Sequence, residues 1–412
     1  MKKVLIAAAI LLAVGTGVCF GQTADGDFKP ISTNIVGQEY PKVDSQRRVM
    51  FRINAPEAQS IRVFGTDLTK GEDGFWTGIT KPLDPGFHYY QLTIDGVNVA
   101  DPSSESFFGS GNVRSGIEIP EPGVDFYDFK DVPHGEIRSR WYRASTTGEI
   151  RHAYIYTPPD YDKNPQKRYP VLYLQHGMGE DRRAWANQGR TNFILDNLIA
   201  AGKAQPMIVA IEDGGIAAGV RRPRGSGGAA PARGDAAAGR GGAAQTRDGA
   251  ANRGGAAPAR GGRGGFNFNM PFVTAIINDV IPMVDSTYRT IADREHRAMA
   301  GLSLGGTQTY QITADNLDTF ANIGIFSAPF GFPGVETGYN GLLAKPDEFA
   351  EQVKVFFISM GSKEGERTGR AVHVELEQAG VNHVYYEAPG TGHEFQTWRK
   401  SLNEFAQLLF RK

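Results

Sequence analysis

Cysteine is almost absent from this sequence: Cys19 is the only one among 412 residues, so no disulfide can form within the chain. Charge of one sign is not in excess either, because 44 lysines and arginines stand against 45 acidic residues. A nucleic-acid-binding protein would normally be basic, so we expect no nucleic-acid partner. With 40% hydrophobic and 22% charged residues, the composition is that of a globular protein, and the length predicts two domains.

The start of the chain predicts a secretory signal peptide over residues 1–21. Two lysines are followed by the apolar segment Val4 to Val14, which is too short for a membrane span, and then by small residues that suit cleavage after Gly21. A lipoprotein attached through Cys19 is the weaker alternative, because a bulky valine precedes that cysteine. We therefore expect a secreted or periplasmic protein with no membrane segment in its mature form.

Residues 28–125 predict a small all-β domain. Short segments in which apolar and polar residues alternate, among them Arg48 to Ile53, Ile61 to Phe64 and His88 to Ile94, are separated by Asp-Gly and Pro-Gly turns. Strands of this length at this spacing are typical of a β-sandwich. We predict an immunoglobulin-like sandwich here, followed by a linker over residues 126–144.

Residues 145–412 have the pattern of an α/β domain. Continuous apolar runs, such as Tyr169 to Gln175 and Val355 to Ile358, predict buried parallel strands. Helical segments, including Thr191 to Ala201 and Phe272 to Tyr288, lie between such runs. Alternating strands and helices predict a three-layer α/β/α sandwich.

One segment, residues 219–265, fits neither domain. It consists of Gly, Ala, Arg, Pro and a few polar residues, with one Val and no aromatic residue, and we predict a disordered insertion. Its Arg-Gly-Gly triplets suggest RNA binding as one alternative function. Its basic charge suggests adhesion to acidic polysaccharide as another. The export signal argues against RNA, and we favour a tolerated low-complexity loop.

The segment Gly301 to Gly306 contains the pattern G-x-S-x-G. It lies between a short predicted strand, Arg297 to Ala300, and a helical segment, Thr307 to Ala314, which is the context of a nucleophile elbow. Ser303 is therefore the predicted nucleophile, and the N–H of Leu304 is the first predicted oxyanion donor. A glycine-rich turn that holds a serine by chance is the alternative.

A serine nucleophile needs a base, and hydrolases of this layout carry the serine, the acid and the histidine in that order along the chain. Of the eight histidines, only His393 lies in a glycine-rich loop between a predicted strand, Val384 to Ala388, and a final helix. Loops at the carboxyl ends of strands are where sites of α/β proteins are built. The sequence therefore predicts His393 as the base, and a purely structural position next to a helix N-cap is the alternative.

The acid is expected after the preceding strand, Lys354 to Met360. Glu364 is the first carboxylate beyond this strand and is the predicted acid. Glu366 is the close alternative, and either residue could instead be a solvated loop charge.

A second oxyanion donor is expected in the His-Gly turn that follows the strand Val171 to Gln175. The N–H of Met178 is the first choice and that of Gly179 the second, whereas His176 is expected to orient the loop. No group of His, Cys and carboxylate residues has metal-ligand spacing, and no phosphate loop or dinucleotide fingerprint occurs, so we expect no metal and no cofactor.

A family resemblance rests on several segments of the α/β part: Tyr173 to Gly177, Asp196 to Ile199, Tyr288-Arg289, Gly301 to Gly306, Ile323 to Ser327 and Gly390 to Arg399. Through them, roughly residues 145–412 resemble carbohydrate esterase family 1, the secreted feruloyl and acetyl-xylan esterases, within the wider esterase D group that includes enterochelin esterases. The N-terminal part resembles the glycogen-binding-type module of family 48 through Gly74 to Trp76, Pro85 to Tyr90, Asp95-Gly96 and Asp101-Pro102. Its aromatic residues suit a core or a sugar platform, and we favour the core.

The resemblance implies an α/β-hydrolase fold with Ser303 as nucleophile, His393 as base and an acid in the Glu364 loop, where the family often has Asp. It implies a secreted serine esterase that cleaves feruloyl or acetyl esters on plant cell-wall polysaccharide, with the polysaccharide or a small acyl ester as its partner. Enterochelin-type or general carboxylesterase activity is one alternative. A carbohydrate-binding protein with a vestigial esterase domain is another, and the complete Ser, Glu and His set favours the esterase. The acyl group, the sugar and the oligomeric state stay open.

Overall fold

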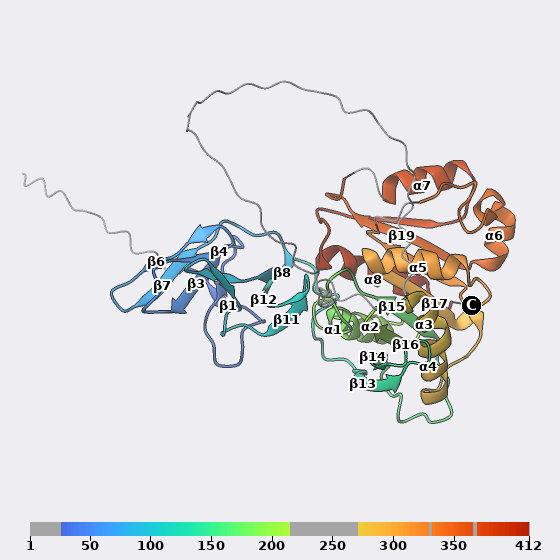
Figure 1. Ribbon diagram of the computed structural model, residues 1–412, viewed down its shortest axis with the longest axis horizontal. Helices are drawn as coiled ribbons and strands as arrows, with labels where there is room; N and C mark the ends of the chain where they lie inside the picture. The colour runs from blue at the N-terminus through green and yellow to red at the C-terminus, as the bar shows by residue number, and fades with distance from the viewer. Residues whose placement is uncertain (1–25, 215–270, 329–331, 366–368, 412) are drawn as a thin grey trace, which may run out of the picture.

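The computed structural model describes residues 26–214, 271–328, 332–365 and 369–411. The predicted signal peptide, residues 1–21, and the predicted insertion, residues 219–265, lie outside these ranges, as does Glu366. Figure 1 shows an all-strand part beside a part in which helices cover a sheet. We call them the N-terminal strand region, residues 29–119, and the α/β region, residues 136–408.

The N-terminal strand region consists of three antiparallel sheets, with strand orders β1-β2-β3-β7-β6, β10-β9-β4-β5 and β11-β12-β8. Within residues 26–119 the structure describes strands and turns but no helix. The strands are β1 (Lys29–Pro30), β2 (Lys42–Val43), β3 (Val49–Asn54), β4 (Ile61–Val63), β5 (Thr66–Asp67), β6 (Thr69–Lys70), β7 (Phe75–Ile79), β8 (Gly86–Tyr90), β9 (Leu92–Ile94), β10 (Val97–Val99), β11 (Ser106–Gly109) and β12 (Asn112–Ile119).

The core of this region follows from the alternation of its strands. In β3, Val49 and Phe51 point inward and are fully buried. Trp76 and Tyr90 belong to the same core, and Phe87 is buried where the region meets the α/β region. These aromatic side chains therefore stabilise the fold and expose no face on which a sugar could stack.

The predicted strand His88 to Ile94 is wrong, because the structure has two strands there. β8 pairs with β12, whereas β9 pairs with β4 and β10 in a different sheet. Tyr90 and Leu92 are both buried, so the alternation of apolar residues continues across the change of sheet. The sequence pattern could not reveal the break for that reason.

The α/β region is built on an eight-stranded sheet of order β13-β14-β16-β15-β17-β18-β19-β20. β13 and β14 are antiparallel to their neighbours, and the strands from β16 to β20 run parallel to one another. The strands are β13 (Glu136–Arg143), β14 (Ile150–Thr157), β15 (Val171–Gln175), β16 (Ile208–Glu212), β17 (Arg297–Leu302), β18 (Asn322–Phe326), β19 (Val355–Gly361) and β20 (Val384–Ala388).

Helices cover both faces of this sheet. Alternate residues of β15 point to opposite sides: Leu172 and Leu174 pack with α1, α2 and α8, whereas Val171 and Tyr173 pack with α3, α4 and α5. α6 and α7 pack over the β18 and β19 end of the second face. No helix of the described residues has the length and apolar character needed to cross a bilayer. The helices are α1 (Arg183–Ala186), α2 (Thr191–Ala200), α3 (Pro271–Ala275), α4 (Ile281–Thr287), α5 (Leu304–Ala314), α6 (Pro346–Gln352), α7 (Gly369–Gln378) and α8 (Phe395–Leu408).

Two boundaries differ from the sequence prediction. Residues 136–143, predicted as part of the linker, form β13 and pair along their whole length with β14, because the β14 edge of the sheet accepts a further strand. The predicted helix Phe272 to Tyr288 contains a π-helical turn, Ile276–Val280, between α3 and α4. Pro282 follows this turn and has no N–H to donate, which favours the local change in hydrogen bonding.

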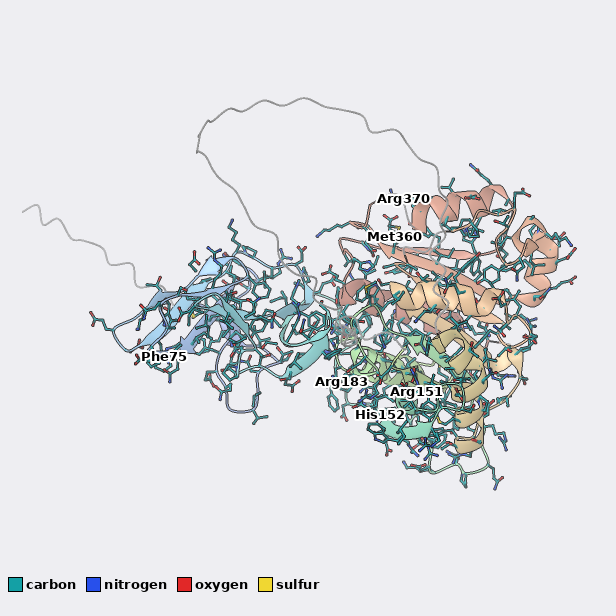
Figure 2. The ribbon with its side chains drawn as sticks, viewed as in Figure 1. Phe75, Arg151, His152, Arg183, Met360 and Arg370 are labelled. Carbon is teal, nitrogen blue, oxygen red and sulfur yellow. The ribbon has the colours of Figure 1, made fainter. Side chains whose placement is uncertain are left out.

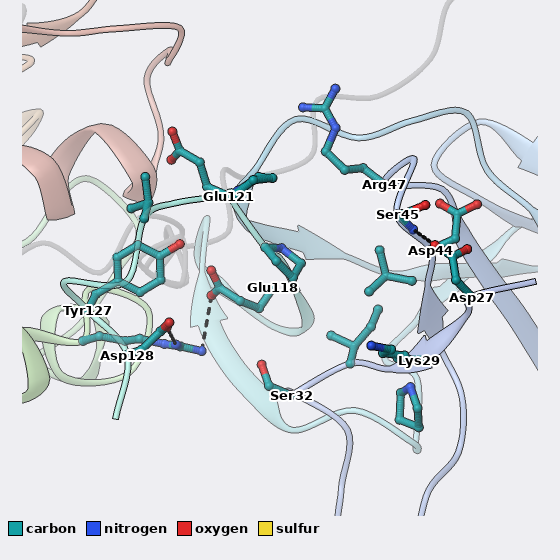
Figure 3. Close-up of a pocket in the computed structure, with 17 residues that line it drawn as sticks. Asp27, Lys29, Ser32, Asp44, Ser45, Arg47, Glu118, Glu121, Tyr127 and Asp128 are labelled. Carbon is teal, nitrogen blue, oxygen red and sulfur yellow. Dashed lines mark hydrogen bonds and ion pairs between the residues drawn. The ribbon is translucent and has the colours of Figure 1, made fainter. Parts of the chain in front are cut away.

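A buried ion pair joins the two regions. Glu118 of β12 accepts hydrogen bonds from Arg399 of α8 at 2.7 and 2.9 Å, and Arg399 is fully buried. Figure 3 shows Glu118 with Tyr127 and Asp128 beside a cavity of about 760 Å³ between the first strands and the segment that leads into the α/β region. No residue of the loops after β15, β17 or β19 lines this cavity.

Candidate active site

The nucleophile elbow places Ser303 in the sharp turn between β17 and α5. Its backbone dihedrals, φ 51° and ψ −117°, lie in a region that residues other than glycine rarely adopt. A Cβ on Gly301 would meet the backbone of Gly305 at 2.4 Å, and a Cβ on Gly305 would meet the carbonyl oxygen of His176 at 2.5 Å. The turn therefore requires glycine on both sides of the serine, which is the physical content of the G-x-S-x-G pattern.

The structure brings Ser303, His393 and Glu364 together in one hydrogen-bonded chain. The Ser303 Oγ lies 3.0 Å from His393 Nε2, and His393 Nδ1 lies 2.8 Å from Glu364 Oε2. An ionised carboxylate accepts from the protonated Nδ1, which leaves Nε2 free to accept the proton of the serine hydroxyl. The three residues come from the loops after β17, β19 and β20, all at the carboxyl edge of the parallel strands.

Glu364 is held from several directions. Its Oε1 accepts hydrogen bonds from the Ser327 hydroxyl at 2.6 Å and from the Gly361 N–H at 2.8 Å. Burial opposes ionisation of this carboxyl, but the hydrogen bonds from His393, Ser327 and Gly361 outweigh it and lower the pKa of Glu364. Glu364 is thus an ionised acceptor at neutral pH. The sequence prediction overlooked Ser327 in this role, although its position directly after the apolar strand β18 was available as a signal.

The loop after β15 lies against the nucleophile. A Cβ built on Gly177 would be 3.5 Å from the Cβ of Ser303, so Gly177 borders the serine and Met178 and Gly179 follow it in the chain. The Met178 side chain is exposed, and the φ of Gly179 is +77°, in the left-handed region that favours glycine. Leu304 begins α5, where its N–H belongs to the first helical turn. We call residues 176–179 the oxyanion loop, after the second oxyanion donor predicted there.

His176 is not part of the hydrogen-bonded chain. Its imidazole is buried, its Nδ1 lies 2.9 Å from the Gly177 carbonyl oxygen, and its Nε2 has no hydrogen-bond partner among the described residues. Its ring lies beside Gly214, at the end of the described part of the chain after β16. Its role in orienting the oxyanion loop stays a prediction.

The N-terminal strand region also reaches the oxyanion loop. The N–H of Gly111, in the turn between β11 and β12, donates to the carbonyl oxygen of Gly179 at 2.8 Å. The Tyr89 hydroxyl lies 3.5 Å from Glu180 Oε1, and Glu180 Oε2 accepts from the Gly177 N–H at 2.9 Å. Burial raises the pKa of Glu180. Sequence reasoning missed these contacts because they join segments that are distant along the chain.

Metal ligation has no support in the described residues, where no group of three or more His, Cys, Asp or Glu side chains could hold an ion. The side chains that the structure does bring together are a hydroxyl, an imidazole and a carboxylate. Such a set supports nucleophilic attack by the serine and proton transfer by the histidine.

The parallel sheet, the elbow and the serine–histidine–acid chain define a protein of α/β-hydrolase type. A family described as "Putative esterase" matches residues 144–246 and 238–408, and the chain belongs to this esterase family. The family match confirms the predicted esterase relationship for the α/β region.

Individual relatives agree with this assignment. The chain is 37% identical over 404 residues to the "Endo-1,4-beta-xylanase/feruloyl esterase" of Xylanibacter ruminicola, an alignment that covers 93% of this chain and 48% of the relative. This chain thus spans about half the length of that protein.

Solved structures show the same fold. The enterobactin esterase of Shigella flexneri is similar with a TM-score of 0.57 and 14% identity, over 87% of this chain and 92% of that chain. A CE1 ferulic acid esterase from Anaeromyces mucronatus is similar with a TM-score of 0.50 and 22% identity, over 70% of this chain and 96% of that chain. These likenesses confirm the predicted α/β-hydrolase type of fold.

Proposed function

We propose that the protein is a serine carboxylic ester hydrolase in which Ser303 is the nucleophile, His393 the base and Glu364 the acid. The observation that carries this proposal is the unbroken chain of hydrogen bonds from Ser303 Oγ through His393 to Glu364, at 3.0 and 2.8 Å. Nucleophile, base and orienting acid within hydrogen-bond reach are the geometric signature of an activated serine.

In the first half of the reaction, Ser303 Oγ forms a bond to the ester carbonyl carbon while its proton moves to His393 Nε2. Glu364 stabilises the imidazolium and holds the ring in the required tautomer. The N–H groups of Leu304 and Met178 donate to the oxyanion, with Gly179 as the alternative second donor. The carbon–oxygen bond to the leaving alcohol then breaks, and the alcohol takes the proton from His393.

The second half regenerates the serine. Water attacks the acyl carbon of the acyl-enzyme and gives a proton to His393 Nε2, which passes it to Ser303 Oγ as the acid is released. No cofactor is needed to balance either half.

For the substrate, we propose acyl esters of plant cell-wall polysaccharide, with feruloyl or acetyl as the acyl group. Support comes from the name of the Xylanibacter ruminicola relative, which is a xylanase and feruloyl esterase, and from the segments that resemble carbohydrate esterase family 1.

Hydrolysis assays with the purified protein test this proposal directly. Methyl ferulate, acetylated xylan and 4-nitrophenyl acetate separate feruloyl, acetyl and unspecific esterase activity. A fluorophosphonate probe should label Ser303, as located by mass spectrometry of the labelled peptide, and Ser303→Ala should prevent labelling. Absence of both labelling and turnover would favour a binding protein whose esterase site is vestigial.

We also propose export to the periplasm or beyond, on the sequence of residues 1–21 alone. Protein recovered from the periplasm or medium of an expressing bacterium should begin at Gln22. An N-terminus at Met1 in that fraction would contradict cleavage.

A further inference from the structure

A pocket of about 350 Å³ lies beside the oxyanion loop and is separate from the Ser303, His393 and Glu364 chain. Three parts of the fold and one residue of β11 form its walls. It is lined by Trp141, Glu149, Ile150, Arg151 and His152 of the β13–β14 hairpin, by Glu180, Asp181 and Arg182 after the oxyanion loop, by Asp213 after β16, and by Phe108. Its volume is within the range of about 300–1,000 Å³ that is typical of ligand sites.

The register of the sheet places this pocket at the same edge as the nucleophile. Ala153 of β14 pairs with Glu212, the last residue of β16, so residues 150–152 extend beyond the carboxyl end of that strand. Three strand spacings separate β14 from β17, which is about 14 Å. A feruloyl or acetyl group bonded to the reacting carbon is too short to span this distance, whereas the sugar chain of the leaving alcohol can reach it.

Trp141 gives the pocket a flat apolar surface. Tryptophan is the largest side chain, yet that of Trp141 is 61% exposed. Its ring stacks on the ring of His152, with centroids 4.0 Å apart and an interplanar angle of 14°. One face of the indole is therefore covered by the imidazole, and the opposite face is available. His152 is itself fixed, because its Nε2 lies 2.6 Å from the Ser139 hydroxyl. Burial lowers the pKa of His152, so the supporting ring is neutral.

Polar groups surround this surface. Arg182 pairs with Asp213 at 2.9 Å, yet its buried Nε has no hydrogen-bond partner among the described residues, and neither has the buried Nδ1 of His152. Arg183 pairs with Asp181 and lies over the Phe108 ring at 5.5 Å. Figure 2 shows Arg183 near the junction with the N-terminal strand region, and His152 and Arg151 further from it within the α/β region. A sugar offers apolar C–H faces to an aromatic ring and hydroxyl groups to charged side chains, so this combination suits it.

We propose that the pocket between Trp141, Phe108 and Arg182 binds the saccharide part of the ester substrate, with the open face of Trp141 as its stacking surface. This inference rests on the proposed ester hydrolase function, since it assigns the leaving-group side of the same substrate. Because Phe108 belongs to β11, the N-terminal strand region contributes a side chain to this saccharide pocket.

The test compares two esters that share the acyl group. Trp141→Ala should raise the KM for a feruloylated arabinoxylo-oligosaccharide about tenfold, the scale of one lost aromatic contact, and leave the kinetics of methyl ferulate unchanged. Trp141→Phe should restore most of the affinity because it keeps a flat ring. An equal change for both esters, or no change for the oligosaccharide, would overturn the inference.

Phe129 provides a matched control. It is 69% exposed and stacks on His134 at 4.6 Å and 15°, an arrangement like that of Trp141, but it does not line this pocket. Phe129→Ala should leave the KM for both esters unchanged.

A binding experiment separates failure of this inference from failure of the proposed function. Calorimetric titration of the wild-type protein and of Trp141→Ala with an unesterified arabinoxylo-oligosaccharide requires no catalysis. Binding by the wild-type protein that Trp141→Ala loses supports the pocket even if no ester is cleaved. Equal affinity, or no binding by the wild-type protein that does cleave the feruloylated oligosaccharide, rejects the pocket and leaves the esterase proposal intact.

Discussion

The N–H of Gly111 donates to the carbonyl oxygen of Gly179 at 2.8 Å, and so connects a strand turn of the N-terminal region to the oxyanion loop. The two backbones are in close contact, because a Cβ on Gly179 would lie 2.9 Å from the Gly111 nitrogen. A loop that supplies oxyanion donors must hold its N–H groups in place before the reaction begins. We therefore expect the N-terminal strand region to hold the proposed oxyanion donors in place.

Substitution of Tyr89 tests whether the N-terminal strand region supports the oxyanion loop. Its hydroxyl accepts from Gln188 Nε2 at 2.6 Å and faces Glu180, the residue that holds the Gly177 N–H. Tyr89→Phe should lower kcat about tenfold with little change in KM, because a displaced donor weakens transition-state binding more than substrate binding. Steady-state kinetics on methyl ferulate measure this split.

Tyr161→Phe is the control for that variant. The Tyr161 hydroxyl accepts from the Arg289 N–H at 2.9 Å near the start of β15, at the opposite edge of the sheet. The Tyr161→Phe variant should therefore leave kcat unchanged. A rise in KM with constant kcat in Tyr89→Phe would show that Tyr89 acts on substrate binding and not on the oxyanion loop.

Glutamine variants of Glu364 and Glu366 test which of the two carboxylates is the acid. Glu364→Gln keeps the shape of the side chain but removes the charge that fixes the His393 tautomer, and should lower kcat roughly 10⁴-fold. Glu366→Gln should change kcat only a few-fold. Rates on 4-nitrophenyl acetate decide the point, and near-normal turnover by Glu364→Gln would transfer the acid role to another carboxylate.

The site was largely predictable because its residues follow local rules. Ser303, His393 and Glu364 each occur in a loop after an apolar strand, and in an α/β sheet such loops converge at one edge. The choice of Glu364 over Glu366 as the predicted acid relied only on its being the first carboxylate after the strand. The structure brings Glu364 into contact with His393, whereas Glu366 is outside the described residues.

The remaining features depend on contacts between distant segments. Ser327 lies next to Glu364 only because β18 and β19 are neighbours, and Gly111 reaches Gly179 only because the two regions pack together. β13 was mistaken for a linker because it is an edge strand with exposed side chains, so it lacks the apolar run of a buried strand. Hydrophobic periodicity contains no information about any of these contacts.

The strained backbone of Ser303 predicts a difference between two inactive variants. Both Ser303→Ala and Ser303→Gly remove the nucleophile and should lower kcat about 10⁶-fold. Glycine tolerates φ 51° and ψ −117° without the steric penalty of a Cβ, so Ser303→Gly should be more stable than Ser303→Ala by about 1 kcal/mol. Thermal unfolding of the two purified proteins measures the difference, and equal midpoints would mean that the elbow stores no strain.

The buried pair of Arg399 and Glu118 predicts how stability depends on pH. Burial opposes ionisation of Glu118, but the charge and hydrogen bonds of Arg399 outweigh it and hold the pKa of Glu118 below its usual value. The folded state therefore gains stability from this carboxylate above the pKa of the unfolded chain and loses it as the pH falls through the lower folded value. Arg399→Met leaves Glu118 buried without its main partner and should lower the free energy of unfolding by about 3–5 kcal/mol at pH 7. The deficit should shrink at pH 4, where protonation of Glu118 relieves the unpaired charge, as unfolding midpoints at both pH values would show.

Lys400→Met, which breaks the more exposed contact with Glu121 at 2.8 Å, is the control and should lower the free energy of unfolding by about 1 kcal/mol or less. A deficit for Arg399→Met that is the same at pH 7 and pH 4 would mean that lost packing, and not the unpaired carboxylate, destabilises the variant.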